Sequence, residues 1–466
     1  MELLIPLDSR SKKPLYEQIY SHIRAEIRNG SLKAGERLPS TRVLAEHLKV
    51  SRSTTQMAYD QLLAEGYMES RPCRGYFVSH LDELVETGPS GAEEMETTAE
   101  PDAGWRVDFS PRGIDLDSFP YHVWRKLSRN TLVDDNKEMF HSGNHQGEPG
   151  LREAIRSYLH SARGVNCSPE QIIVGAGSEY LLMLLSQILE GKHVIAMENP
   201  TYKQAYRVFR SLDYEVCPVE MDANGMEPEL LTRSGANVAY VMPSHQFPTG
   251  VVMPVGRRQE LLKWAVEAPD RYIIEDDYDS EFRYRGKPIP ALQGMDRSGR
   301  VIYLGTFSKC IAPAIRVSYL VLPTHLLLRY RSQTSFYAST VSRIDQNILY
   351  QFLAGGYFER HLNRMRAVYK TKHDLLLEQI EPLRERFEIR GEHAGIHILL
   401  TSRQGESEEQ LIQKAEEAGV KVYGLSSYFI HPQHNHRPAT VVLGYASLSE
   451  EQIVEGIRLL MECWGA

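Results

Sequence analysis

The chain has 466 residues, of which 42% are hydrophobic and 24% are charged. At about 150 residues per domain, this length indicates two to four domains with a sizeable core. The formal net charge is −8, and this whole-chain value argues against a nucleic-acid binder, because such proteins carry a basic footprint. The charge is uneven, however: residues 1–80 hold 12 Lys/Arg and 9 Asp/Glu, whereas residues 81–104 hold eight acids and no base.

The cysteines and the N-terminus indicate the compartment. The five cysteines show no CxxC spacing, and an odd, scattered set fits reduced thiols better than a disulfide framework. The N-terminus lacks the basic and apolar regions of a signal peptide. No run approaches the roughly 18 apolar residues that mark a membrane span. We therefore expect a soluble, cytoplasmic protein.

Residues 81–104 combine Gly, Pro, Ser, Thr and acidic residues with no aromatic residue. A segment of this composition buries too little apolar surface to order itself. The sequence therefore predicts a flexible acidic linker between two domains, residues 1–80 and residues 105–466.

The segment before the linker has the pattern of a small helical domain. Apolar residues repeat every four positions from Leu15 to Ile27, which predicts a helix over 14–29 with Pro14 as its first residue. Ser40 and Ser51 are suitable N-caps for a helix that continues to His47 and a second helix that ends at Gly66. Two capped helices joined by a tight turn form a helix-turn-helix, and a hairpin is predicted over 67–78.

Basic and hydroxyl side chains gather at the starts of these two short helices and at the hairpin tip. Cations and hydroxyls at helix N-termini suit phosphate contacts, and Arg or Gln can read bases in the major groove. The alternative is a three-helix domain with ordinary surface arginines, and the placement favours DNA binding. The predicted DNA-binding residues are Arg42, Arg52, Ser53, Thr54, Gln56, Arg74 and Gly75.

Residues 14–78, from PLYEQIYSHIRAEIRNG to SRPCRGYFV, resemble the winged helix-turn-helix domain of the GntR family of bacterial repressors and activators. The resemblance extends over the whole of this segment. It implies operator contacts by Arg42, Arg52, Ser53, Gln56 and the wing pair Arg74 and Gly75.

Residues 105–466 alternate short apolar runs with polar or glycine-containing stretches, as in RYIIEDDYDSEFRY and VIYLGTFSKC. Strands that alternate with helices predict an α/β fold with a mainly parallel sheet. Ligands of such sheets bind beyond the carboxyl ends of the strands. The residues with the most suggestive chemistry follow the predicted strands.

Lys309 follows a predicted strand over 301–304. A single loop lysine is usually a solvated surface group, but Thr306, Ser308 and Arg316 lie near it in the sequence. A lysine that forms a Schiff base, with hydroxyls and an arginine to hold a phosphate, is what pyridoxal 5'-phosphate requires. Further cofactor partners are predicted at a helix start (Gly177, Ser178 and Glu179), at the ring nitrogen (Asp276, directly after a strand over 272–275), at the ring oxygen (Tyr278) and on the ring face (Tyr202).

These residues lie in motifs that resemble, in the expected order, those of the fold-type I aminotransferases: GNHQGEPGLREAI, GAGSE, ENPTY, PTG, EDDYDSEF and SKCIAPAIR. The resemblance extends from about Val107 to the C-terminus and implies a large and a small domain. It implies that Lys309 is the aldimine lysine and that Gly177, Ser178, Thr306 and Arg316 bind the phosphate. A GntR-type domain joined to such a body is the layout of the MocR/GabR regulators, which implies a homodimer with its DNA-binding domains exchanged.

Three positions depart from the aminotransferase pattern. Phe247 replaces the asparagine that contacts the ring oxygen, and Ser142 replaces a tyrosine that reaches the neighbouring subunit's phosphate. The strand that usually carries the substrate-carboxylate arginine has none over 442–446. Arg437, in a nearby loop, is a candidate substitute, although a loop arginine is more often a solvated charge.

The stretch HPQHNHRP contains three closely spaced histidines, which can suggest a metal site. It offers no Cys or carboxylate partner close by, and its prolines mark an irregular loop. We therefore predict no metal site at His431, His434 and His436.

Three functions are consistent with these sequence features. The first is a transcriptional regulator that binds operator DNA and senses an amine, an amino acid or a cofactor vitamer through a Schiff base at Lys309. The second is a working aminotransferase with an accessory DNA-binding domain, and the third is a body used only for dimerisation. The missing carboxylate arginine favours the first over the second, and the full cofactor set argues against the third.

Overall fold

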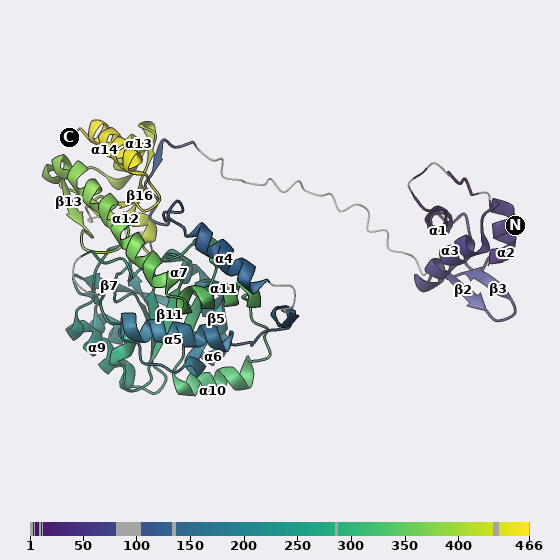
Figure 1. The fold of residues 1–466 in the computed structure, drawn as a ribbon, viewed down its shortest axis with the longest axis horizontal. Helices are drawn as coiled ribbons and strands as arrows, with labels where there is room; N and C mark the ends of the chain where they lie inside the picture. Colours follow the sequence, from purple (N-terminus) through teal and green to yellow (C-terminus); the bar gives the residue numbers. More distant parts are fainter. Residues whose placement is uncertain are drawn as a thin grey trace. The chain divides into compact units, whose positions relative to one another are not determined.

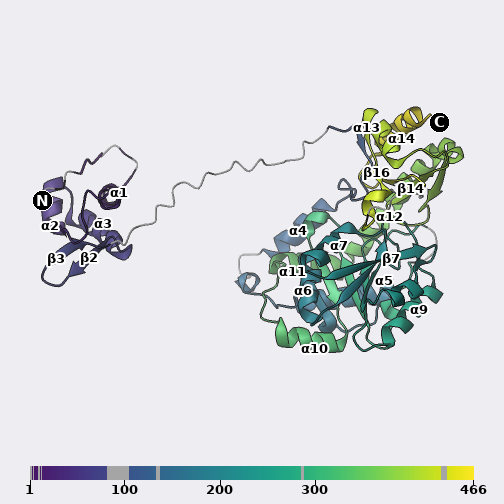
Figure 2. The same cartoon turned by 180° about the vertical axis from the view of Figure 1, so that it is seen from behind.

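The computed structural model describes residues 13–80, 104–132, 137–284, 288–431 and 438–465, together with residues 3, 5–8 and 11. The chain divides into two compact units, Met1–Pro101 and Asp102–Ala466 (Figures 1 and 2). Each unit has its own apolar core. Residues 81–103 of the predicted linker lie outside the described residues.

The N-terminal unit is a winged helix-turn-helix, as predicted. Its second and third helices begin at serine caps, because Ser40 Oγ accepts from the Val43 amide at 3.3 Å and Ser51 Oγ accepts from the Thr54 amide at 3.2 Å. Pro14 is the N-cap of the first helix and not its first residue. The elements are α1 (Leu15–Arg28), β1 (Arg37–Leu38), α2 (Thr41–Leu48), α3 (Arg52–Ala64), β2 (Met68–Arg71) and β3 (Gly75–Val78), and the strands pair in the order β1-β3-β2.

The larger lobe of the C-terminal unit is built on an eight-stranded sheet. Its strands are parallel except for β12, which is antiparallel to both of its neighbours, and β8 at one edge. The mainly parallel sheet predicted from the sequence is therefore confirmed. In spatial order the strands are β5 (Ile172–Gly175), β12 (Ser318–Val321), β11 (Val301–Thr306), β10 (Tyr272–Asp277), β9 (Val238–Val241), β6 (Val194–Asn199), β7 (Glu215–Asp222) and β8 (Gly225–Met226).

Helices cover both faces of this sheet and bury the apolar residues of its strands. One face packs against α6 (Ser178–Ile188), α7 (Lys203–Ser211) and α10 (Thr324–Gln333). The other face packs against α4 (Tyr121–Thr131), α5 (Pro149–Arg163), α8 (Pro228–Arg233), α9 (Val255–Val266) and α11 (Arg343–Ala354). Short 3-10 helices lie at Lys137–Phe140, Pro169–Gln171, Gln293–Met295 and Pro313–Ile315.

The smaller lobe contains an antiparallel sheet and a two-stranded parallel pair. The long helix α12 (Tyr357–Gln379) joins the lobes, because Phe358 packs in the larger core and Leu376 in the smaller one (Figure 1). No helix among the described residues has the length and apolar character needed to cross a membrane. The elements of this lobe are β13 (Phe387–Arg390), β14 (His397–Ser402), β17 (Thr440–Gly444), β16 (Tyr423–Gly424), β4 (Val107–Asp108), β15 (Val420–Lys421), α13 (Glu408–Glu417), α14 (Glu450–Trp464) and 3-10 helices at Glu381–Glu385 and Leu425–Tyr428.

Candidate cofactor site and DNA-binding surface

A cavity of about 300 Å³ lies beyond the carboxyl ends of β10 and β11, where a parallel sheet binds its ligands. Nine of the ten residues predicted to bind the cofactor line it, and the tenth, Gly177, is the N-cap of α6 directly before the lining residue Ser178. The nine are Ser178, Glu179, Tyr202, Asp276, Tyr278, Thr306, Ser308, Lys309 and Arg316.

One end of the cavity has the donors of an anion site. The backbone at Gly177 has φ +99°, and a Cβ there would lie 2.3 Å from Arg316 Nη2, so only glycine lets the guanidinium approach the start of α6. Arg316 forms an ion pair with Glu179 at 2.8 Å. The Thr306 hydroxyl accepts from the Ser318 hydroxyl at 2.9 Å and from the Ser308 amide at 3.2 Å. A helix N-terminus, hydroxyls and a guanidinium together suit a phosphate.

Asp276 lines the same cavity. It lies inside β10 and not after it, because the strand extends to Asp277, two residues beyond the predicted end. Burial raises the pKa of this carboxyl to about 7, and the hydrogen bond donated by the Tyr240 hydroxyl opposes the increase. A carboxylate with so little solvent is stabilised by a nearby cation, which suits a protonated ring nitrogen. Sequence reasoning missed Tyr240, whose place on the adjacent strand β9 was its only signal.

Lys309 reaches the cavity from the loop after β11. Its Nζ donates to the backbone carbonyl of Arg112 at 2.7 Å and to that of Pro111 at 3.4 Å. Burial lowers the pKa of this amine to about 8, and the negative charge of Asp279 opposes the decrease. Near neutral pH a larger fraction of this amine is therefore neutral, and hence nucleophilic, than of an ordinary lysine.

Tyr278 belongs to a buried polar group that sequence reasoning did not find. His245 Nδ1 lies 3.1 Å from the Tyr278 hydroxyl and 2.9 Å from Asp279 Oδ2. Phe247, at the position expected to hold asparagine, packs its ring edge-on to Tyr202 and Tyr278, with centroids 6.1 and 6.0 Å apart. The histidine–aspartate pair thus supplies polar contacts beside the apolar side chain of Phe247. The sequence could have indicated both residues through their closeness to known motif positions. Asp279 lies in EDDYDSEF, and His245 lies two residues before Phe247.

The other departures can be located in part. Every residue of β17 is buried, and Ser142 is exposed. His434, His436 and Arg437 lie outside the described residues, and within the described ranges no group of His, Cys, Asp and Glu could hold a metal ion. Arg112 lines the cavity in addition to the predicted Arg316, and no motif had indicated it.

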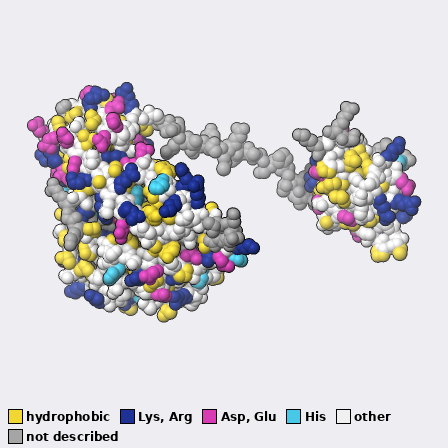
Figure 3. All heavy atoms as spheres, in the orientation of Figure 1, with side chains coloured by type: hydrophobic (Ala, Val, Ile, Leu, Met, Phe, Trp, Pro, Cys, Tyr) yellow, Lys and Arg dark blue, Asp and Glu magenta, His cyan; other side chains and the backbone are white. Residues whose placement is uncertain are grey.

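In the N-terminal unit, the predicted DNA-binding side chains lie on the surface. Arg42, Arg52 and Arg74 are exposed, and Figure 3 shows Lys and Arg side chains gathered on the side where Figure 1 labels α2 and β3. Arg42 forms an i,i+4 ion pair with Glu46, and Gln56 donates to Asp60 at 2.8 Å. The hydroxyls of Ser53 and Thr54 bond to the Ser51 cap, and Gly75 begins the second strand of the wing.

The cavity as a whole fits pyridoxal phosphate. It offers a phosphate site that a Cβ at Gly177 would fill, a buried carboxylate for a basic ring nitrogen, and a lysine with a lowered pKa in the same space. When bound, the cofactor supplies an aldehyde carbon that exchanges between primary amines. Residues 115–459 match the family Aminotransferase class I and II, and residues 15–78 match the gntR family of bacterial regulatory proteins. The chain therefore joins a GntR-type DNA-binding domain to a body of the pyridoxal-phosphate-dependent aminotransferase fold.

Comparison with whole relatives gives the family. The chain is 41% identical to the HTH-type transcriptional regulator YdeL of Bacillus subtilis over 97% of each chain. It is 35% identical to the probable rhizopine catabolism regulatory protein MocR of Rhizobium meliloti, over 98% of this chain and 95% of that one. The multiple substrate aminotransferase of Thermococcus profundus superposes with a TM-score of 0.69 at 28% identity, covering 77% of this chain and 90% of that one. The chain belongs to the MocR/GabR family of HTH-type transcriptional regulators.

Proposed function

We propose that this regulator binds operator DNA through the winged helix-turn-helix and responds to a primary amine, an amino acid or a cofactor vitamer at Lys309. The observation that carries the proposal is the position of the Lys309 amine, which has a pKa of about 8 and shares one cavity with the predicted cofactor residues. An effector amine that took the place of Lys309 on a bound cofactor would change the contacts in the cavity. An effector alters DNA binding only if it binds two arrangements of the protein with different affinity.

We assign a role to each predicted site residue. Gly177, Ser178, Thr306, Ser308 and Arg316 hold the phosphate, and Glu179 keeps Arg316 in position. Asp276, Tyr278 and Tyr202 hold the ring. Arg42, Arg52, Ser53, Thr54, Gln56, Arg74 and Gly75 contact DNA.

Assembly and location complete the proposal. Fold-type I aminotransferase domains are typically dimeric, and we propose that two bodies, each formed by residues 105–466, make a homodimer. The linker 81–104 lets the DNA-binding domain of each chain, residues 1–80, exchange places with that of its partner. Two DNA-binding domains require a two-part operator. Because its target is DNA, we place the protein in the cytoplasm.

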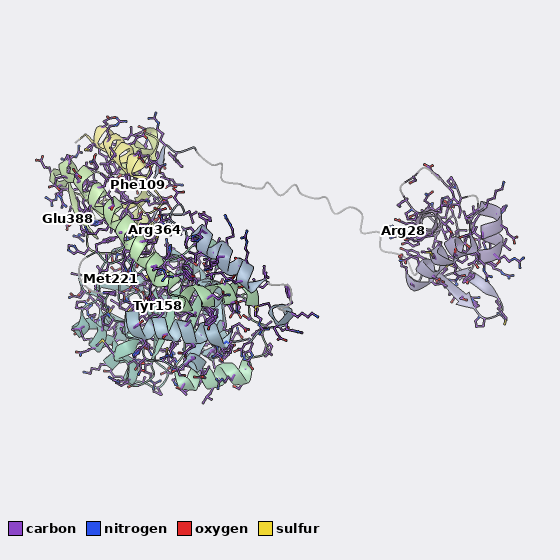
Figure 4. All side chains as sticks on the ribbon, viewed as in Figure 1. Arg28, Phe109, Tyr158, Met221, Arg364 and Glu388 are labelled. Atoms are coloured by element: carbon purple, nitrogen blue, oxygen red, sulfur yellow. The ribbon has the colours of Figure 1, made fainter. Side chains whose placement is uncertain are left out.

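A mobility-shift assay on the DNA upstream of its own gene, with and without a panel of amines, tests the proposal. Lys309→Ala should lose the visible absorbance of the bound cofactor and the response to amines but keep DNA binding, whereas the exposed Lys263→Ala on α9 should keep all three. Arg52→Ala should weaken the complex and reduce its salt slope by about 1. The matched control is Arg28→Ala, which changes an exposed arginine at the C-terminal end of α1, outside the predicted DNA-binding residues (Figure 4). Absence of a specific shift together with multiple-turnover transamination would establish the enzyme instead.

A further inference from the structure

Arg112 comes from the smaller lobe but lies beside the reactive lysine. Phe109, labelled in Figure 4, is fully buried in the smaller core. Its amide donates to the Lys421 carbonyl at 3.0 Å, and its carbonyl accepts from the Gly444 amide at 2.9 Å. Three residues later, the Arg112 carbonyl accepts a hydrogen bond from Lys309 Nζ. The segment 109–112 therefore joins the small-lobe sheet to the cavity.

The same segment covers the end of β17. A Cβ on Gly444 would lie 2.2 Å from the Ser110 carbonyl oxygen and 2.4 Å from Pro111 Cα. The sequence around Gly444 carries no arginine, in contrast to the pattern of the aminotransferases. The arginine at this end of the cavity thus comes from the covering segment and not from the strand below it.

Arg112 is also the cavity arginine that the proposed phosphate site does not use. Arg316 is paired with Glu179. The guanidinium of Arg112 has no carboxylate partner among the described residues. Arg112 lines the cavity together with Pro111 and Phe247. The positive charge of Arg112 acts to lower the pKa values of Lys309, Tyr202 and Tyr428, so Arg112 lies within electrostatic range of these three groups.

We propose that Arg112 binds the carboxylate of an effector whose amine engages the cofactor at Lys309. A guanidinium pairs with a carboxylate through two parallel hydrogen bonds, which fix the orientation of the ligand. The effector class is then amino acids, in preference to amines that lack a carboxylate. This inference rests on the proposed function and specifies its ligand.

Titration of the cofactor-loaded, full-length protein with matched pairs of ligands tests the assignment. The pairs are glycine with methylamine, β-alanine with ethylamine, and 4-aminobutyrate with propylamine, and the readout is the half-saturation of the change in visible absorbance. Wild type should bind at least one amino acid more tightly than its matched amine, by about tenfold. A tenfold difference corresponds to the lower end of the free energy of a charge-assisted hydrogen bond. We expect the lower end because Arg112 is exposed to solvent.

Arg112→Gln should remove this preference without weakening the response to the plain amine. The ratio within a pair is the decisive quantity, because Arg112 also lowers the pKa of Lys309 and a change in that pKa affects both members alike. Arg112→Lys should keep part of the preference, since it keeps the charge but loses the paired hydrogen bonds. Arg437→Gln removes the competing loop arginine and should leave the preference unchanged.

The outcomes separate this inference from the function on which it rests. A spectrum that responds to amines in both proteins, with the same amino acid preference in wild type and Arg112→Gln, would overturn the role of Arg112 and leave sensing at Lys309 intact. Loss of the preference in Arg437→Gln alone would reassign the carboxylate to that loop. A cofactor-loaded protein that responds to no primary amine and no amino acid would overturn the part of the proposed function on which this inference rests, the sensing of amines at Lys309.

Discussion

The approach of Arg316 to the start of α6 makes Gly177 the most sensitive backbone position of the cofactor site. Its backbone angles, φ 99° and ψ 162°, fall in a region that is essentially restricted to glycine, so alanine costs about 1–3 kcal/mol of backbone strain. The new Cβ would lie 2.3 Å from Arg316 Nη2, 2.9 Å from Cζ and 3.0 Å from Glu179 Oε2. These atoms must move, and the Arg316–Glu179 ion pair must rearrange.

Gly177→Ala should therefore weaken cofactor binding as well as stability. Losing one charge-assisted contact to a phosphate costs about 1.5–3 kcal/mol, which corresponds to roughly a tenfold to hundredfold weaker affinity. The assay is titration of cofactor-free protein with pyridoxal phosphate, followed by absorbance. Gly235→Ala is a matched control, because Gly235 also has a positive φ, of 71°, but a Cβ there would meet no atom within 4 Å. It should lose about 1 kcal/mol of stability and keep its affinity. If Gly177→Ala binds the cofactor as tightly as Gly235→Ala, the close approach of Arg316 is not part of the binding site.

Three further measurements test the electrostatics and the DNA-binding domain. The rate of cofactor capture should rise as the pH increases to about 8 and then level off, because the pKa of Lys309 is lowered to about 8 and only the neutral amine attacks. Since Asp279 raises that pKa, Asp279→Asn should move the midpoint to lower pH, and a flat profile in stopped-flow absorbance would contradict the assignment. Tyr240→Phe removes a hydrogen bond that lowers the pKa of Asp276. Less of the carboxyl is then ionised near pH 7, so the affinity for the cofactor should fall. Unchanged affinity would mean that the Asp276 carboxylate does not bind the ring nitrogen. Thr55→Val removes a 2.8 Å hydrogen bond to the carbonyl at the start of α2 and should speed hydrogen exchange in α2 and α3 about fivefold, from a loss of about 1 kcal/mol, whereas unchanged exchange would mean that this bond adds no net stability.

The parts of the fold that could be predicted from the sequence are those set by local chemistry. Ser40 and Ser51 cap their helices as expected, because a hydroxyl at that position satisfies a free amide of the first turn. The predicted cofactor residues lie around one cavity because parallel strands end at one edge of a sheet, so residues that follow different strands meet there. Strand limits were less certain, and β10 extends over Asp276 itself.

The residues that escaped prediction are positioned by tertiary contacts. The Tyr240 hydroxyl on β9 donates to Asp276 on the neighbouring strand β10. His245 contacts Tyr278 and Asp279 from a separate loop. Nothing in the sequence around Arg112 distinguishes it from a surface arginine. Its relevance depends on the fold of the 109–112 segment over β17, which no local pattern encodes.

The origin of the two cationic groups indicates how a ligand can change the arrangement of the protein. Lys309 belongs to the larger lobe, whereas the 109–112 segment is bonded to the sheet of the smaller lobe. A ligand held at its amine by the site of Lys309 and at its carboxylate by Arg112 makes both contacts only when the lobes are close together. Its affinity is then higher for a closed arrangement than for an open one, and this difference is the free energy available to shift the balance between them. A plain amine makes one of the two contacts and should shift that balance less.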